Sequence, residues 1–307
     1  MTIEKLQAHH GFTKMPFRRD LAPGMLHRHG AHAEAAARIS WCISEHAPGV
    51  ITGEAGAGKT AALRAALASP GPSRHTLICL GNPSAGVRGI NHAIVAAPGG
   101  VPQTHHATLT PQAMDLLARE HAERGRIPVL AIDEAHMPEP AQPEAVRMLT
   151  NHDPDATCPP ACLLTGQPTL RRPIKPGILA APGQRIAVRY TMPGMTGEET
   201  ASYIHHHLKL AGRSGPLSSD DAITLTHATS RGLPTAASNL AIQALIAAYA
   251  GRKATIDESS ARTAATEVTA DRPPSRHHEH QGPAGTLPAG PFHAPTSSPA
   301  MTPPSSS

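Results

Sequence analysis

The chain has 307 residues, of which 39% are apolar and only 2% aromatic, and its formal net charge is +4. A charge this small excludes a highly charged disordered chain for the bulk of the sequence, and the 26 glycines, which follow no period of three, exclude collagen. No apolar stretch is long enough to span a bilayer, and the first residues lack the apolar region of a signal peptide. We therefore expect a cytoplasmic protein that contacts no membrane.

Composition divides the chain into four blocks. Residues 1–30 form a mixed leader, residues 31–192 alternate between helix and strand patterns, and residues 193–270 show helix patterns only. Residues 271–307 form a tail in which nine of 37 residues are proline. Because the tail has almost no large apolar residue, burial cannot offset its ordering entropy, and we expect it to be disordered.

The predicted elements of residues 31–192 begin with a helix and a short apolar strand, and they then alternate. In chain order they are a helix at Ala31–His46, a strand at Val50–Thr52, a helix at Lys59–Ala68, a strand at Thr76–Leu80, helices at Ile90–Ala97 and Pro111–Arg124, a strand at Ile127–Ile132, a helix at Glu144–Asn151, and strands at Ala161–Thr165 and Arg185–Tyr190. This alternation predicts an α/β fold with a three-layer parallel sheet core. Residues 193–270, called the helical block below, would form a small lid.

A glycine-rich loop between the first strand and the second helix carries the strongest chemical signal. Gly53, Glu54, Ala55, Gly56, Ala57, Gly58, Lys59 and Thr60 match the phosphate-binding pattern G-x-x-x-x-G-K-[ST] in full. Glycines let backbone N–H groups curl around phosphate oxygens at a helix N-terminus. Lys59 would then reach the β- and γ-phosphates, and Thr60 would offer its hydroxyl to Mg²⁺. The loop predicts an ATP site.

Two carboxylates follow the apolar strand at residues 127–132. Asp133 and Glu134 therefore lie at the carboxyl end of a buried strand, where α/β sheets bind ligands. Asp133 is predicted to complete the Mg²⁺ shell with Thr60, and Glu134 to polarise the attacking water as a general base. The same residues begin the DEAH of a helicase class, but such helicases need a second motor domain, and only the helical block remains.

Other polar residues are candidates for sensing the γ-phosphate. Arg185 is our candidate for the cation that stabilises the transition state, although it could equally serve only to bind solvent or an acidic surface. In the loop after the strand at 161–165, Gln167 or Thr165 could position water, and a plain loop is the alternative.

Cysteine and histidine give no metal signal. Cys158 and Cys162 form one isolated pair, which favours two ordinary thiols over a zinc site. Three adjacent histidines, His205–His207, fall within a helical pattern and point about 100° apart, so they cannot share one metal. We expect most of the 21 histidines to lie on the surface.

With these residues assigned, the chain resembles AAA+ ATPases, more narrowly the family that joins general secretion pathway protein A-type ATPases with transposition helper ATPases. The resemblance covers roughly residues 1–268, and its motifs in order are HHGFTKMPF, GEAGAGKT, VLAIDEAH, LLTGQPTL, QRIAVRYTMPGMTGEETASYI and RGLPTAASNL. It implies that ATP lies between core and lid, with the leader near Phe17 close to the adenine. It also implies a homo-oligomer whose subunits exchange arginines, often assembled on DNA.

Two departures from the family pattern bear on activity. Relatives tend to read G-x-P-R at the lid helix, but here Gly232-Leu233-Pro234 is followed by Thr235. The lid arginine is missing unless Arg231 replaces it from the preceding turn, so hydrolysis is expected to couple weakly to lid motion. Prolines where relatives carry helix or apolar residues predict weakened stability as well. They are Pro98, Pro138, Pro140, Pro143, Pro173, Pro176 and Pro182.

Three functions remain open at this point. The first is a DNA-associated transposition helper that hydrolyses ATP with Mg²⁺ and acts with a transposase, and the sequence pI of about 9.0 permits a DNA partner. The second is a secretion-type ATPase. Its members carry a membrane span and a periplasmic domain after the ATPase region, and this chain shows neither, which favours the first. The third is a nucleotide-binding scaffold that does not hydrolyse.

Overall fold

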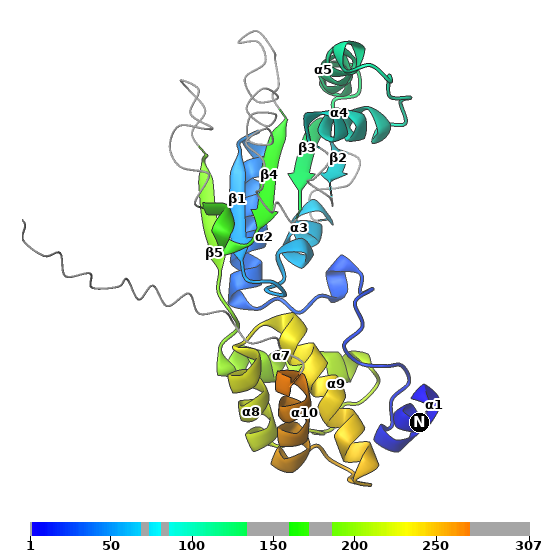
Figure 1. Ribbon diagram of the computed structural model, residues 1–307, viewed down its shortest axis with the longest axis vertical. Coiled ribbons are helices and arrows are strands. Elements are labelled where there is room, and N and C mark those ends of the chain that lie inside the picture. Colours follow the sequence, from blue (N-terminus) through cyan, green and yellow to red (C-terminus); the bar gives the residue numbers. More distant parts are fainter. Residues whose placement is uncertain (1, 69–73, 81–85, 134–159, 172–185, 271–307) are drawn as a thin grey trace, which may run out of the picture. The chain divides into compact units, whose positions relative to one another are not determined.

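The computed structural model describes residues 2–68, 74–80, 86–133, 160–171 and 186–270. In this part of the chain, five strands form one sheet in the order β2-β3-β4-β1-β5, and every neighbouring pair is parallel (Figure 1). The strands are β1 (Gly49–Gly53), β2 (His75–Leu80), β3 (Ile127–Ile132), β4 (Ala161–Gly166) and β5 (Val188–Met192). The predicted parallel sheet is confirmed.

Helices cover both faces of this sheet. Along β3, Val129 and Ala131 pack with residues of α2 (Gly30–Ser44) and α3 (Lys59–Ala68). The alternate residues, Leu130 and Ile132, pack with α4 (Gly86–Ala96) and α5 (His106–Ala122), which lie beside β2 and β3 in Figure 1. Because successive side chains of a strand point to opposite faces, this division gives the three-layer core that the alternating pattern predicts.

The sheet order brings three strand ends together. β4 lies between β1 and β3, with Ile51 opposite Thr165 and Ile132 opposite Leu164. The segments that follow β1 and β3 therefore meet the end of β4 at the carboxyl edge of the sheet. Parallel α/β sheets place their ligands at this edge.

Several predicted boundaries shift by a few residues. α5 begins at His106, so Pro111 lies inside the helix and does not begin it as predicted. The helix starts earlier because the His105 carbonyl already accepts hydrogen bonds from Thr108 and Leu109 N–H. Pro98 follows the end of α4 and interrupts no helix. The other six prolines singled out above and the predicted helix at 144–151 lie outside the described residues.

The helical block contains α7 (Gly197–Leu210), α8 (Asp220–Ser230), α9 (Pro234–Ala250) and α10 (Glu258–Ala270). The N-termini of two of these helices are capped by side chains. Thr196 and Glu199 form a capping box at α7, and the Ser219 hydroxyl accepts a hydrogen bond from Ala222 N–H at α8. Proline at the first position suits the start of α9. Among the described helices, none combines the length and apolar character needed to cross a bilayer.

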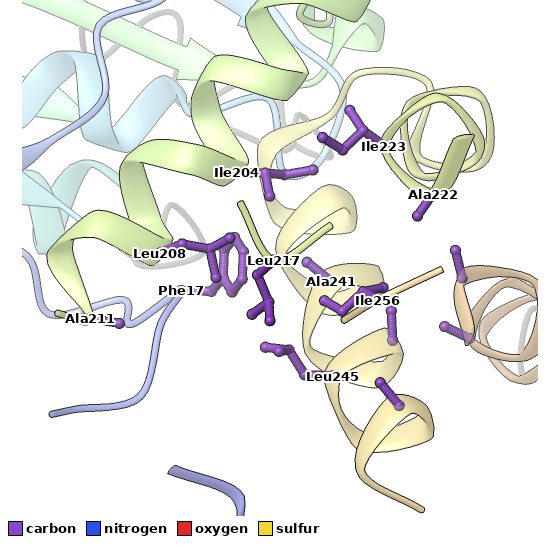
Figure 2. Close-up of a cluster of buried hydrophobic side chains, with 14 of the residues drawn as sticks. Phe17, Ile204, Leu208, Ala211, Leu217, Ala222, Ile223, Ala241, Leu245 and Ile256 are labelled. Atoms are coloured by element: carbon purple, nitrogen blue, oxygen red, sulfur yellow. The ribbon is translucent and has the colours of Figure 1, made fainter. Parts of the chain in front are cut away.

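The leader packs against the helical block. Its helix α1 (Ile3–His10) ends at Gly11, and the following Phe12 and Phe17 belong to the same buried cluster as Leu208, Leu217 and Leu245. Figure 2 shows Phe17 beside Leu208, although nearly two hundred residues separate them. His10 Nε2 lies 3.1 Å from the Leu245 carbonyl oxygen. The leader therefore forms one hydrophobic core with helices from the other end of the described chain.

Candidate functional site

The glycine-rich loop joins β1 to α3 in a conformation that requires its glycines. Gly56 and Gly58 have φ angles of 81° and 94°, which L side chains rarely adopt. Between them Ala57 is fully buried, and its N–H donates to the Glu54 carbonyl at 3.1 Å. The loop thus wraps tightly and turns into the first residue of α3, Lys59.

Lys59 crosses back over this loop. Its Nζ donates to the carbonyl oxygens of Gly53 and Glu54, each at 2.9 Å, and the residue is buried. A buried ammonium group needs such partners, because an unpaired charge in a low-dielectric site is costly. These bonds hold the charge beside the loop, where an anion would be attracted to it.

Asp133 is held by two threonines, one at the start of α3 and one near the end of β4. Thr60 Oγ1 donates to Asp133 Oδ2 at 2.6 Å, and Thr165 Oγ1 donates to Oδ1. The Asp133 N–H donates to the Leu80 carbonyl at 2.9 Å, which holds the segment at the end of β3. A hydroxyl and a carboxylate side by side are oxygen ligands of the kind Mg²⁺ prefers, so these residues fit that ion.

A cavity of about 590 Å³ opens beside these groups. The core side of its lining includes Gly56, Gly58, Lys59, Thr60, Asp133 and Gln167, together with Ala55. The opposite side comes from the leader and the helical block, through Phe17, Arg18, Arg19, Tyr203, Thr235 and others. Ligand pockets in proteins commonly measure about 300–1,000 Å³, so the cavity is of nucleotide size.

The predicted site residues do not all meet here. Gly53 and Glu54 line a neighbouring cavity of about 240 Å³. Thr165 contacts Asp133, whereas Gln167 is exposed at the cavity wall, so the two candidates after β4 occupy different places. The predicted base Glu134 and the predicted cation Arg185 lie outside the described residues.

The start of α9 touches the glycine-rich loop directly. Thr235 N–H donates to the Gly56 carbonyl at 3.3 Å, and a Cβ added at Gly56 would lie 2.9 Å from Thr235 Cβ. Arg231 forms an ion pair with Glu54 and lines the smaller cavity, not the larger one. Arg231 therefore does not take the place of the absent lid arginine in this arrangement.

Several histidines of the site are exceptions to the expectation that most histidines lie on the surface. His29, His32 and His207 are at most 5% exposed, and with the half-buried His27 they line the larger cavity. Burial lowers the pKa of His29 and of His207 to about 4. The sequence gives little sign of this, because the burial of His207 depends on Phe17, whose ring stacks on it at 5.1 Å.

The described histidine and cysteine side chains do not form a metal-binding arrangement. Within the described residues, no group of three or more His, Cys, Asp or Glu side chains could hold a metal ion. Cys162 is buried in β4, and burial raises the pKa of its thiol to about 12. Its predicted neighbour in the sequence pair, Cys158, lies outside the described residues.

Known proteins share this sequence pattern and this fold. Residues 43–174 match a family described as an AAA domain. Over 267 residues the chain is 29% identical to general secretion pathway protein A of Aeromonas hydrophila, an alignment that covers 85% of this chain and 48% of that protein. The chain thus spans about half the length of this relative.

Solved structures resemble the fold at lower identity. Cdc6p of Pyrobaculum aerophilum has a TM-score of 0.62 at 14% identity, covering 82% of this chain and 70% of that one. The ORC2 protein of Aeropyrum pernix, in its ADPNP-ADP complexes, has a TM-score of 0.60 at 16% identity and covers 83% and 70%. The loop, the strand order and the matched domain together show a P-loop α/β fold of the AAA+ type, and over most of its length the chain is similar to general secretion pathway protein A.

Proposed function

We propose that this chain binds ATP with Mg²⁺ in the larger cavity and hydrolyses it. The observation that carries the proposal is the grouping of Lys59 and Thr60, at the start of α3, with Asp133 after β3, beside a cavity of about 590 Å³. Lys59 would neutralise phosphate charge, while Thr60 and Asp133 would hold Mg²⁺. When bound, the ion would supply further charge neutralisation on the phosphate oxygens.

Three further residues complete the proposed mechanism. Glu134, directly after Asp133, would orient the attacking water and accept its proton. Arg185 would stabilise the transition-state charge, supplied by a neighbouring subunit of a homo-oligomer. Gln167, exposed at the cavity wall, would contact the terminal phosphate or the water.

Turnover measurements test this proposal. Purified protein should release phosphate from ATP only with Mg²⁺ present, and Glu134→Gln should bind nucleotide but lose turnover by about 10²-fold or more. The matched control is Glu123→Gln, an exposed carboxylate after α5, which should keep full turnover. Nucleotide binding without turnover in the unaltered chain would favour the scaffold function. Thr235, which stands where relatives carry the lid arginine, favours the same function.

We further propose that the ATPase acts on DNA as a transposition helper with a transposase partner. Support comes from the six ordered motifs of the resemblance and from a pI of about 9.0. Double-stranded DNA should then stimulate turnover and promote oligomer assembly in the presence of ATP. Cytoplasmic localisation belongs to the same proposal.

The 29% identity to general secretion pathway protein A favours a second candidate, a secretion-type ATPase. Sedimentation of the protein with ATP, with and without DNA, separates the two. Assembly that depends on DNA supports the transposition helper. Assembly and turnover that do not depend on DNA would contradict the transposition helper and support the secretion-type function.

A further inference from the structure

Four histidines form one wall of the larger cavity, and we call His27, His29, His32 and His207 the histidine wall. They come from the end of the leader, from the start of α2 and from α7. All four line the same cavity as Lys59. His29, His32 and His207 are 5%, 3% and 5% exposed, so they are part of the interior.

The rings of the histidine wall contact one another and their aromatic neighbours. The rings of His27 and His29 are stacked with centroids 6.4 Å apart, and those of His29 and His32 are 5.9 Å apart. His207 packs against Tyr203 at 4.5 Å, in addition to its stack on Phe17. A charge acquired by one imidazole is therefore felt by the others.

Several ring nitrogens in the wall have no hydrogen bond of ordinary geometry. They are Nδ1 of His27, Nδ1 of His29 and both nitrogens of His32, although the Ala61 backbone raises the pKa of His32 somewhat against the stronger effect of burial. Buried polar atoms in proteins are usually paired. The wall thus keeps capacity to hold protons that the protein alone leaves unused.

Burial and most of the charged groups around the wall oppose protonation of its histidines. Burial is the largest effect and lowers the pKa of all four histidines, and Arg28 and His206 add repulsion. Glu199 favours the charged forms of His27 and His29. The remaining charged residues of the cavity lining are Arg18, Arg19, Lys59, Arg64 and Asp133, and Arg18 is paired with Asp20.

A polyanion in the cavity reverses this balance. Phosphate oxygens would place negative charge among groups that are mostly cationic, and a nearby opposite charge favours the protonated imidazole. The ring of His32 lies beside the backbone of Ala61, which directly follows Thr60 at the end of the glycine-rich loop. The wall would then contribute positive charge beside the bound phosphates.

We propose that a nucleoside polyphosphate binds in this cavity together with protons taken up by the histidine wall, so that its affinity rises as pH falls from about 8 to about 6. The inference rests on the proposed function, since it takes the cavity to be the nucleotide site. By linkage, each proton taken up strengthens binding by as much as about tenfold per pH unit. The nucleotide site would thereby sense pH.

Calorimetry of the full chain tests the inference without relying on turnover. Mg·ADP is titrated into the protein at pH 6.5 in buffers of different ionisation enthalpy, and the dependence of the observed heat on that enthalpy gives the protons taken up. We expect uptake approaching one proton for the unaltered chain. The variant His29→Gln/His32→Gln should bind with uptake reduced by at least half, while His92→Gln, an exposed histidine on α4, should match the unaltered chain.

The outcomes are distinct. The same nucleotide is used throughout, so its own phosphate titration cancels in the comparison between variants. Binding with equal proton uptake in all three proteins would overturn this inference and leave the proposed function standing. Absence of binding heat at any pH would overturn the proposed function and this inference with it. If the double variant fails to fold, His27→Gln at the half-buried position should still show reduced proton uptake. Unchanged uptake in that variant would contradict proton binding by the histidine wall.

Discussion

The two sides of the cavity are built in different ways. On the core side, the loop that follows β1 and the end of β3 place Lys59 and Asp133 at the same cavity. On the other side, the leader and the helical block contribute single residues such as Phe17 and His207, which meet across long stretches of chain. One side is encoded locally and the other by tertiary packing, and the two should respond differently to mutation and to pH.

Removing the ammonium group of the core side should have the largest effect. Lys59→Ala takes away the charge that the loop carbonyls hold, and we expect nucleotide affinity or turnover to fall by about 10²-fold or more. Phosphate release and fluorescent-nucleotide binding measure this loss. The exposed Lys209→Ala on α7 should change neither, and a Lys59→Ala variant that binds nucleotide normally would contradict the assignment of the phosphate site.

Enlarging Gly56 should disturb the place where the two sides touch. Gly56→Ala puts a methyl group at a φ of 81° and within 2.9 Å of Thr235 Cβ, so we expect about 1–3 kcal/mol of lost unfolding free energy and weaker nucleotide binding. Urea unfolding measures the first quantity. Gly215→Ala, where an added Cβ meets nothing within 4 Å, is the control and should be close to neutral.

Acid should weaken the histidine side in the nucleotide-free protein. The pKa of His29 and of His207 is about 4 in the folded chain and about 6.5 when unfolded, so between these values the unfolded state binds more protons. Stability is therefore expected to fall as pH drops from 6.5 toward 4, by roughly 2–3 kcal/mol for each histidine. Thermal unfolding across this range checks the slope, and His207→Gln should flatten it. A flat profile in the unaltered chain would contradict the burial argument.

The ion pair between Arg231 and Glu54 should give the smallest effect. Both side chains are about half exposed, and such pairs contribute roughly 0–1 kcal/mol that salt reduces. Arg231→Ala should change nucleotide affinity slightly at low salt and not at high salt. Arg119→Ala, which breaks an exposed pair within α5, is expected to leave affinity unchanged at both. Equal effects of the two variants would show that the pair does not link the two sides of the cavity.

Sequence patterns locate the loop and Asp133 of the core side for a physical reason. The phosphate loop is contiguous, and Asp133 ends an apolar strand, so both can be assigned from neighbours in the chain. The parallel sheet follows from the alternation of elements. Boundaries were less accurate, as at Pro111, because the His105 carbonyl starts α5 one turn earlier.

The histidine side could not be predicted in the same way. His205, His206 and His207 are chemically identical in the sequence, yet only His207 is buried, because it faces Phe17 and Tyr203. Nothing in the spacing of His27, His29 and His32 indicates that they share a cavity with a helix that begins at Gly197. Side chains brought together by packing alone leave no local pattern.

The attachment of the leader to α9 has a consequence for synthesis. His10 and its partner Leu245 are 235 residues apart, so a ribosome adding about 5–20 residues per second exposes the leader for about ten to fifty seconds before its partner exists. The sheet can form earlier from contacts of shorter range. The cavity would therefore be completed last, and the apolar side chains of Phe12 and Phe17 would be open to chaperones until then.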